Sequence, residues 1–329
     1  MKIVINTNYV SAGTVILEGI EKRLKKAGHE VYKNDWENYS NYDVAIFMAP
    51  DSRIKEAKIN NNKIFCVLFD PKVSLLRQIQ EIKIADLLIV SSIEQKEYLL
   101  RYNKNIFIYY MFKDVLEVNK EHTQKDKIII GYHGNKQHLS AMQDTSWALD
   151  KLAQEYEIEF WAMYNVEKLG KWVKNLPKKC TVKHLQWSEE ATVSEMSNCD
   201  IGVIPSVLKN SRFWGRPLVT FILNSEGYHY NDYVQRFKFS NNPGRIQVFS
   251  QLSVPLVADF TPSACQIIKD GESGFLVGTK EGWYEALKKL ILDHNLRNEF
   301  SKNLKKEISK VSPDINFEKL MLVLEKKTI

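Results

Sequence analysis

The chain lacks the features of a secreted or membrane-spanning protein. It contains no apolar run of the roughly 18 residues that a helix needs to cross a bilayer. Its N-terminal stretch, MKIVINTNYV, has no long apolar core of the kind found in signal peptides. Cysteine is scarce and forms no CxxC pair, so we expect buried free thiols in a reducing compartment at Cys66, Cys180, Cys199 and Cys265. A cytoplasmic protein is predicted, with contact to the inner face of a membrane left open.

Several motifs of known chemistry are also absent. The sequence has no G-x-x-x-x-G-K-S/T phosphate loop and no G-x-S-x-G elbow, which argues against a P-loop kinase and the usual hydrolase. No basic run is dense enough for a nucleic-acid footprint. His133 and His138 lack the cysteine or carboxylate spacing of metal ligands. The sequence therefore predicts neither a metal site nor a nucleic-acid partner.

The composition is that of a packed globular protein. Its 329 residues suit two domains of ordinary size. Hydrophobic residues make up 44% of the chain and charged residues 26%, which is typical of a folded core with a solvated surface. The net charge of +6 permits anionic ligands without requiring them.

The first third of the chain alternates strand and helix. An apolar stripe of helical spacing covers Gly13–Ala27 and ends at Gly28. The runs IFCVLF and DLLIV are apolar on both faces, as parallel strands covered by helices are. Strands are expected at Lys2–Asn6, Glu30–Lys33, Asp43–Met48, Lys63–Phe69, Asp86–Val90 and Asn105–Tyr110. This pattern predicts a doubly wound sheet.

A second alternating set follows a polar stretch at 113–127, which we interpret as an interdomain linker. The expected elements are strands at 128–132, 157–163, 181–185 and 200–205 and helices at 140–156 and 189–198. An aromatic and basic insertion at 207–236 interrupts this set, and a C-terminal helix at 313–329 is free to pack back on the first domain. The predicted fold class is α/β, with two Rossmann-like doubly wound domains, 1–112 and 128–312, facing a cleft.

The stretch from Lys238 to Val277 contains a well-marked helix start. Asn242 can cap this helix, Pro243 fits its first position and Arg245 falls in its first turn. A helix N-terminus binds phosphate because it offers free N–H groups and a partial positive charge. Lys238 and Arg245 add two cations there, although a solvated charged loop is the alternative interpretation.

A glycine turn follows the strand at 128–132. In GYHGNKQH, the backbone at Gly134 and Asn135 can approach a phosphate closely, and Lys136 can reach one. His138 can hydrogen-bond to a ligand. A plain turn with helix-capping polar residues explains the same segment equally well.

Candidate acid–base residues follow strands of the first domain. Asp70 comes directly after the strand at 63–69, and Asp51 follows the strand at 43–48. An ordinary turn is at least as good an explanation of Asp70, because it precedes a proline. Helix capping likewise explains Ser11–Thr14. The insertion carries aromatic and basic residues that can contact a ligand, a membrane or a partner subunit, or simply pack as a helical subdomain: Arg212, Trp214, Arg216, Tyr228, His229 and Tyr230.

These motifs, in this order, resemble the GT-B glycosyltransferases, and specifically the retaining family called glycosyltransferase group 1. The segments that carry the resemblance are GYHGNKQH, CDIGVIPS, GRIQVFSQLSVPLVA and DGESGFLV, within residues 128–300. The resemblance implies transfer of a sugar from a nucleotide donor in the C-terminal domain to an acceptor in the N-terminal one. The family usually carries two glutamates where this chain has Ser240 and Val248, so we expect donor recognition to depend on phosphate contacts. No Asp-x-Asp occurs, which fits a mechanism without a metal.

The resemblance implies a diphosphate site at Lys238, Ser240, Asn241, Asn242, Gly244 and Arg245, assisted by Gly134, Asn135 and Lys136. Asp70 and His138 are the catalytic candidates. The expected partners are a nucleotide-sugar donor and a saccharide or lipid-linked acceptor, in surface polysaccharide or glycoconjugate biosynthesis, with no other cofactor. Two alternatives stay open: a nucleotide-sugar epimerase on the same fold, and a non-catalytic member that binds a sugar or a partner.

Overall fold

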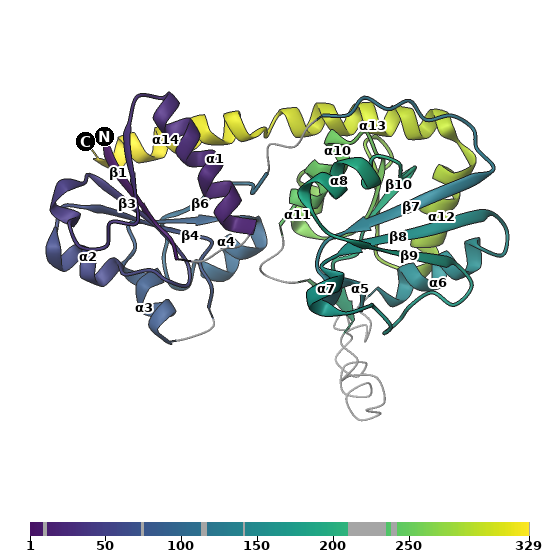
Figure 1. The fold of residues 1–329 in the computed structure, drawn as a ribbon, viewed down its shortest axis with the longest axis horizontal. Coiled ribbons are helices and arrows are strands. Elements are labelled where there is room, and N and C mark those ends of the chain that lie inside the picture. The colour runs from purple at the N-terminus through teal and green to yellow at the C-terminus, as the bar shows by residue number, and fades with distance from the viewer. Residues whose placement is uncertain are drawn as a thin grey trace, which may run out of the picture. The chain divides into compact units, whose positions relative to one another are not determined.

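The computed structural model describes residues 1–8, 12–73, 76–112, 117–140, 142–209, 235–237 and 242–328. These residues form two compact units (Figure 1). Unit 1 consists of the described parts of Met1–Asp114, Phe239–Gly244 and Lys310–Ile329. Unit 2 consists of the described parts of Val115–Lys238 and Arg245–Ser309.

Unit 1 is a six-stranded parallel sheet with helices on its faces. Its strand order is β2-β1-β3-β4-β5-β6. The strands are β1 (Lys2–Asn6), β2 (Glu30–Lys33), β3 (Val44–Met48), β4 (Phe65–Phe69), β5 (Leu87–Val90) and β6 (Ile106–Ile108). The helices are α1 (Ala12–Lys26), the 3-10 turn η1 (Tyr39–Asn41), α2 (Ile54–Asn60), α3 (Leu76–Ile84), α4 (Ile93–Leu99) and α14 (Pro313–Thr328).

The core of unit 1 explains why the last helix belongs to it. Strands β3 and β4 are buried along their whole length, as parallel strands covered on both faces must be. One face packs against α1 and α14, and α14 lies beside α1 in Figure 1. The buried side chains that α14 contributes are Phe317, Leu320, Met321 and Leu324. Arg23 of α1 also forms an ion pair of 2.7 Å with Asp314.

Unit 2 repeats the plan with the strand order β14-β13-β10-β7-β8-β9. Its strands are β7 (Lys127–His133), β8 (Glu157–Tyr164), β9 (Thr181–Gln186), β10 (Ile201–Ile204), β13 (Leu256–Asp259) and β14 (Phe275–Val277), and β11 (Val207–Lys209) pairs antiparallel with β12 (Gln235–Phe237). The helices are α5 (Lys136–Leu139), α6 (Gln143–Leu152), α7 (Val166–Leu169), α8 (Glu189–Met196), α10 (Gly244–Gln251), α11 (Pro262–Cys265), α12 (Lys280–Leu292) and α13 (His294–Ser309).

The polar stretch interpreted as a linker is hydrogen-bonded to unit 2 over its described part. His122 is buried, and its Nε2 lies 2.8 Å from the carbonyl oxygen of Ser253. Its backbone N–H and C=O are both bonded to the side chain of Asn298, at 2.8 Å each. Lys125 pairs with the buried carboxylate of Asp200 at 2.8 Å. Residues 117–126 are thus part of the folded surface of this unit.

The predicted fold class is confirmed: both sheets are parallel and doubly wound. The helix expected at 140–156 is shorter, covering Gln143–Leu152, and a separate helical turn, α5, precedes it. Three thiols are buried as expected, but Cys265 is exposed. Most of the predicted insertion, residues 210–234, lies outside the described residues. Among the residues that the structure describes, no helix is long and apolar enough to span a membrane.

Candidate functional site

The strand order of unit 2 reverses between β7 and β10, and ligands of such sheets bind outside the carboxyl ends of the strands at this reversal. The chain leaves β7 through Gly134 and leaves β10 through Pro205 and Ser206. Helix α10 packs closely over β10 because residue 202 is glycine. A Cβ atom there would lie 2.6 Å from Leu256 and 2.9 Å from Phe249 of α10.

Arg245, in the first turn of α10, lies at this reversal. Its Nη2 donates to Ser206 Oγ at 2.8 Å, and both Nη atoms approach the carbonyl oxygen of Pro205 at 3.4 to 3.5 Å. Its guanidinium carbon lies 5.7 Å from the centre of the Tyr132 ring, within the range of a cation–π contact. Burial lowers the pKa of Arg245, but an arginine remains cationic in proteins. A positive charge is therefore fixed at the carboxyl ends of β7 and β10.

Asp259, at the end of β13, holds the turn that follows β10. Its buried carboxylate accepts a hydrogen bond from the Ser206 N–H at 2.5 Å and another from Trp283 Nε1 at 3.2 Å. These bonds set the position of Ser206, which in turn holds the guanidinium of Arg245. The carboxyl ends of three neighbouring strands thus cooperate in placing one cation.

Gly134 completes this arrangement. Its φ of +147° is rarely adopted by other residues, and a Cβ atom would lie 2.8 Å from Tyr132 Oη and 3.2 Å from Arg245 Cδ. Tyr132 Oη donates to the carbonyl oxygen of Asn135 at 2.8 Å, and burial raises the pKa of this phenol to about 12. The structure therefore brings the predicted residues Gly134 and Arg245 together, with Tyr132 between them.

The other residues of the glycine turn are occupied by local contacts. Asn135 caps α5 by accepting from the Gln137 N–H at 2.9 Å. Lys136 Nζ donates to the carbonyl oxygens of Leu169 at 2.5 Å and Gly170 at 2.8 Å, at the end of α7. Lys136 would have to release these bonds to reach a ligand. His138 is half-buried in α5.

The start of α10 agrees with the predicted cap. Asn242 Oδ1 accepts a hydrogen bond from the Gly244 N–H at 2.8 Å, with Pro243 between them. Gly244 has little room, because a Cβ atom would lie 3.0 Å from the backbone oxygen of Met111. Val248, at one of the two glutamate positions of the family, is buried in α10. Three candidates lie outside the described residues: Lys238, Ser240 and Asn241.

Asp70 belongs to unit 1, where it directly follows β4. Its backbone is left-handed, with a φ of 50°, and its carboxylate pairs with Lys72 at 2.7 Å. Asp70 is thus both a turn residue and an ion-pair partner, and its proposed role in catalysis remains a prediction.

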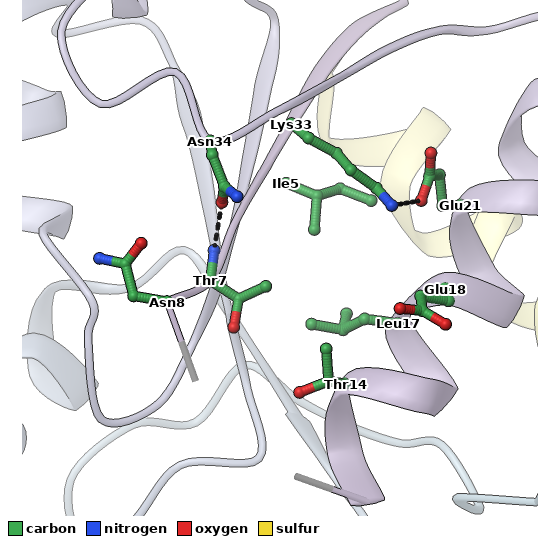
Figure 2. A pocket seen from close by; sticks show the side chains of 9 residues that line it. All are labelled: Ile5, Thr7, Asn8, Thr14, Leu17, Glu18, Glu21, Lys33 and Asn34. Atoms are coloured by element: carbon green, nitrogen blue, oxygen red, sulfur yellow. Dashed lines mark hydrogen bonds and ion pairs between the residues drawn. The ribbon is translucent and has the colours of Figure 1, made fainter. Parts of the chain in front are cut away.

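Unit 1 also contains a pocket of about 360 Å³ between β1, β2 and α1 (Figure 2). Ile5 and Leu17 form its apolar floor. Thr7, Asn8 and Asn34 lie on the strand side, and Thr14 and Glu18 lie on the helix side. The ion pair between Glu21 and Lys33 completes the lining.

Sequence reasoning missed three residues that hold Arg245: Tyr132, Ser206 and Asp259. Tyr132 and Ser206 lie within or just beyond the carboxyl end of a predicted strand, and Asp259 lies at the end of β13, so a position at a strand end is the signal that could have found them. In the ranges that the structure describes, no three His, Cys, Asp or Glu side chains gather as they would around a metal ion.

Solved structures similar to this chain identify the architecture. A glycosyltransferase from Rickettsia africae superposes with a TM-score of 0.63 at 13% identity, over 99% of this chain and 98% of that one. The chain has the GT-B fold. Sucrose-phosphate synthase from Thermosynechococcus elongatus, another GT-B structure, matches with a TM-score of 0.61 at 11% identity, over 99% of this chain and 98% of that one. Anabaena HepE, solved with UDP and glucose, matches with a TM-score of 0.61 at 12% identity, over 99% of this chain and 100% of that one.

The likeness lies in the fold and not in the sequence. No protein-family model matches the chain, and no curated protein matches it at a significant level. At 11 to 13% identity these GT-B structures establish how the two units are built, so the function must be argued from the side chains.

Proposed function

We propose that this protein is a glycosyltransferase that takes a sugar from a nucleoside-diphosphate donor bound to unit 2. The observation that carries the proposal is the position of Arg245, a cation held at the strand-order reversal by Ser206 and Tyr132. Sheets of this kind bind ligands at that place, and a cation there favours an anionic one. The GT-B neighbour HepE was solved with UDP and with UDP-glucose, which supports a donor of this class.

The chemistry follows from the charge of the leaving group. When the bond between the sugar and the diphosphate breaks, negative charge grows on the phosphate oxygens. Arg245 and the N–H groups at the start of α10 would stabilise that charge more strongly in the transition state than in the bound donor. The backbone at Gly134 would approach the ligand closely, because this residue has no side chain of its own. A divalent ion is not needed for this role.

The other predicted site residues would contact the diphosphate or transfer a proton. Asn242 and Gly244, with Lys238, Ser240 and Asn241, would line the diphosphate, and Asn135 and Lys136 would assist from the β7 turn. Asp70 and His138 are proposed as proton-transfer groups. The acceptor would be a saccharide or a lipid-linked glycan, in the assembly of a surface polysaccharide or glycoconjugate.

Calorimetric titration of UDP into the protein tests the proposal. Arg245→Ala should weaken UDP binding by about tenfold to hundredfold, because a charge-assisted hydrogen bond contributes roughly 1.5–3 kcal/mol. Arg245→Lys should bind UDP with an affinity between those of the native protein and Arg245→Ala, because lysine keeps the charge but lacks the planar guanidinium group. Arg101→Ala, which removes an exposed arginine from unit 1, is the matched control. Unchanged UDP affinity in a folded Arg245→Ala protein would contradict the proposal.

A further inference from the structure

The pocket of unit 1 has a preformed shape. Asn34 adopts a left-handed conformation with a φ of 53°, which asparagine tolerates better than most residues. Its N–H donates to the Ile5 carbonyl oxygen at 3.1 Å, and its Oδ1 accepts from the Thr7 N–H at 3.0 Å (Figure 2). The strand side of the pocket is therefore locked by hydrogen bonds before any ligand enters.

Lys33 is the one cationic side chain among the described lining residues, and an ion pair neutralises its charge. Lys33 Nζ lies 2.6 Å from Glu21, and Lys25 binds the other carboxylate oxygen at 2.7 Å. Burial opposes the ionisation of Glu21, but hydrogen bonds from the two lysines outweigh it and lower the pKa of its carboxyl. Lys33 is thus held by a carboxylate that stays ionised, and it offers little attraction to an anion.

Glu18 supplies the remaining charge of the pocket. It lies on the exposed side of α1, one turn after Thr14, and is directed toward the space above Leu17 (Figure 2). No hydrogen bond or ion pair joins its carboxylate to any residue that the structure describes. A carboxylate accepts hydrogen bonds from hydroxyl or ammonium groups and repels phosphates and carboxylates.

The wall chemistry fits a sugar ring. The volume lies at the lower end of the range for small-molecule sites, and an apolar floor with a few polar groups is their usual composition. Asn8, Asn34, Thr7 and Thr14 add amides and hydroxyls around the rim. The pocket also lies at the carboxyl ends of β1 and β2, the edge at which such sheets bind ligands.

We propose that this pocket binds a neutral, hydroxyl-rich sugar ring and that Glu18 selects against rings carrying an acid group. If the ring is part of the acceptor, the inference rests on the proposed function and narrows its substrate class. Unit 2 would then bind the anionic diphosphate at Arg245, and unit 1 would bind an uncharged ring beside Glu18.

Amide NMR spectra of the full chain test this proposal with defined probes. The neutral probes are the methyl glycosides of glucose, galactose and N-acetylglucosamine, and the matched acids are the methyl glycosides of glucuronic and galacturonic acid. At least one neutral glycoside should shift the amide signals of Thr7, Thr14 and Asn34 in a saturable manner. Its matched acid should bind about tenfold more weakly or not at all.

Two substitutions at the exposed Glu18 site make the result decisive. Glu18→Gln keeps the shape and removes the charge, so the neutral and acidic probes should bind within about twofold of each other. Glu18→Trp should fill the pocket and abolish binding of both the neutral and the acidic probes. Glu97→Gln, which removes an exposed charge from α4 of the same unit, should leave the preference for neutral over acidic probes unchanged.

Failure of this inference differs from failure of the proposed function. If UDP binds and Arg245→Ala weakens it, but no neutral glycoside shifts the pocket signals, the pocket assignment is wrong and the transferase proposal stands. The selectivity is also wrong if the acids bind the native protein as well as the neutral glycosides do. If glycosides bind as described and no nucleotide does, the proposed function fails while the sugar pocket remains.

Discussion

Gly134 has no room for a side chain in the candidate donor site. Gly134→Ala should reduce stability by about 1–3 kcal/mol, because an alanine there has a strained backbone. It should also weaken UDP binding, since its Cβ atom would displace Tyr132 and the Arg245 side chain. Chemical denaturation and calorimetry measure the two effects.

Gly271 provides the control for this substitution. It also has a positive φ, of 73°, but a Cβ atom there meets nothing within 4 Å. Gly271→Ala should therefore cost stability through strain while leaving UDP affinity unchanged. Equal UDP affinity in the two variants would mean that crowding at Gly134 has no bearing on the ligand site.

His122 predicts a pH dependence of stability. Burial, with the nearby charges of Lys120 and Arg297, lowers its pKa to about 4 from an ordinary value of 6.5. The folded protein therefore keeps His122 neutral at a pH where the unfolded chain binds a proton. Stability should fall as the pH drops from 6.5 to 4, by about 3 kcal/mol in all, and this residue should cause no further loss below pH 4.

Urea denaturation at several pH values, compared with His122→Gln, isolates this contribution. The glutamine amide can donate to the Ser253 carbonyl oxygen as the imidazole does, but it does not titrate between pH 4 and 6.5. The variant should lose less stability than the native protein over that interval. Parallel pH curves for the two proteins would show that His122 is not the group responsible.

Arg297 connects the end of one helix to an irregular segment. Its buried Nη1 donates to the carbonyl oxygens of Leu290 and Ile291 at the end of α12, at 2.5 and 3.1 Å. Its Nη2 donates to Thr123 at 2.8 Å. Arg297→Met should cost about 3 kcal/mol, since it leaves buried carbonyl oxygens without donors.

Hydrogen exchange measures this effect where it arises. Amides of α12 should exchange roughly hundredfold faster in Arg297→Met, and Arg297→Lys should be intermediate. Amides of β3 and β4 in unit 1 serve as an internal control and should not change. Unchanged protection of α12 would mean that these bonds contribute little.

The strands and the start of α10 could be predicted because their signals are local. Apolar runs marked the parallel strands, and Asn242 and Pro243 marked the helix that places Arg245. Element boundaries follow less directly from local signals. The sequence predicts Asp86 within a strand, but Asp86 precedes β5, and its carboxylate accepts a hydrogen bond from the Cys66 N–H of the neighbouring strand at 2.8 Å. That contact depends on how distant segments pair, which the local pattern does not contain.

The same limit applies to the candidate site. Gly134 and Arg245 were predicted because a glycine turn and a helix start each have a sequence signature. Tyr132, Ser206 and Asp259 have none, since their roles exist only after three strands are placed side by side. Lys136 was predicted as a ligand group, but the end of α7, distant in the sequence, occupies its ammonium.

Unit 1 depends on both ends of the chain, because α14 fills the core beside α1. Leu320 is fully buried in α14, whereas the nearby Leu322 is 58% exposed. Leu320→Ala should destabilise unit 1 by about 2–5 kcal/mol, and Leu322→Ala by less than about 0.5 kcal/mol. Similar losses in the two variants, measured by urea denaturation, would contradict the assigned packing.

Deleting residues 313–329 should have a larger effect of the same kind. The deletion removes four buried apolar side chains from the core of unit 1 and none from that of unit 2. Amides of β1, β3 and β4 should therefore lose most of their protection from hydrogen exchange, while those of β7, β8 and β10 keep theirs. UDP should still bind the shortened chain, because Arg245 and the residues that hold it, Tyr132, Ser206 and Asp259, belong to unit 2. Loss of protection throughout both sheets would instead show that the units fold as one cooperative body.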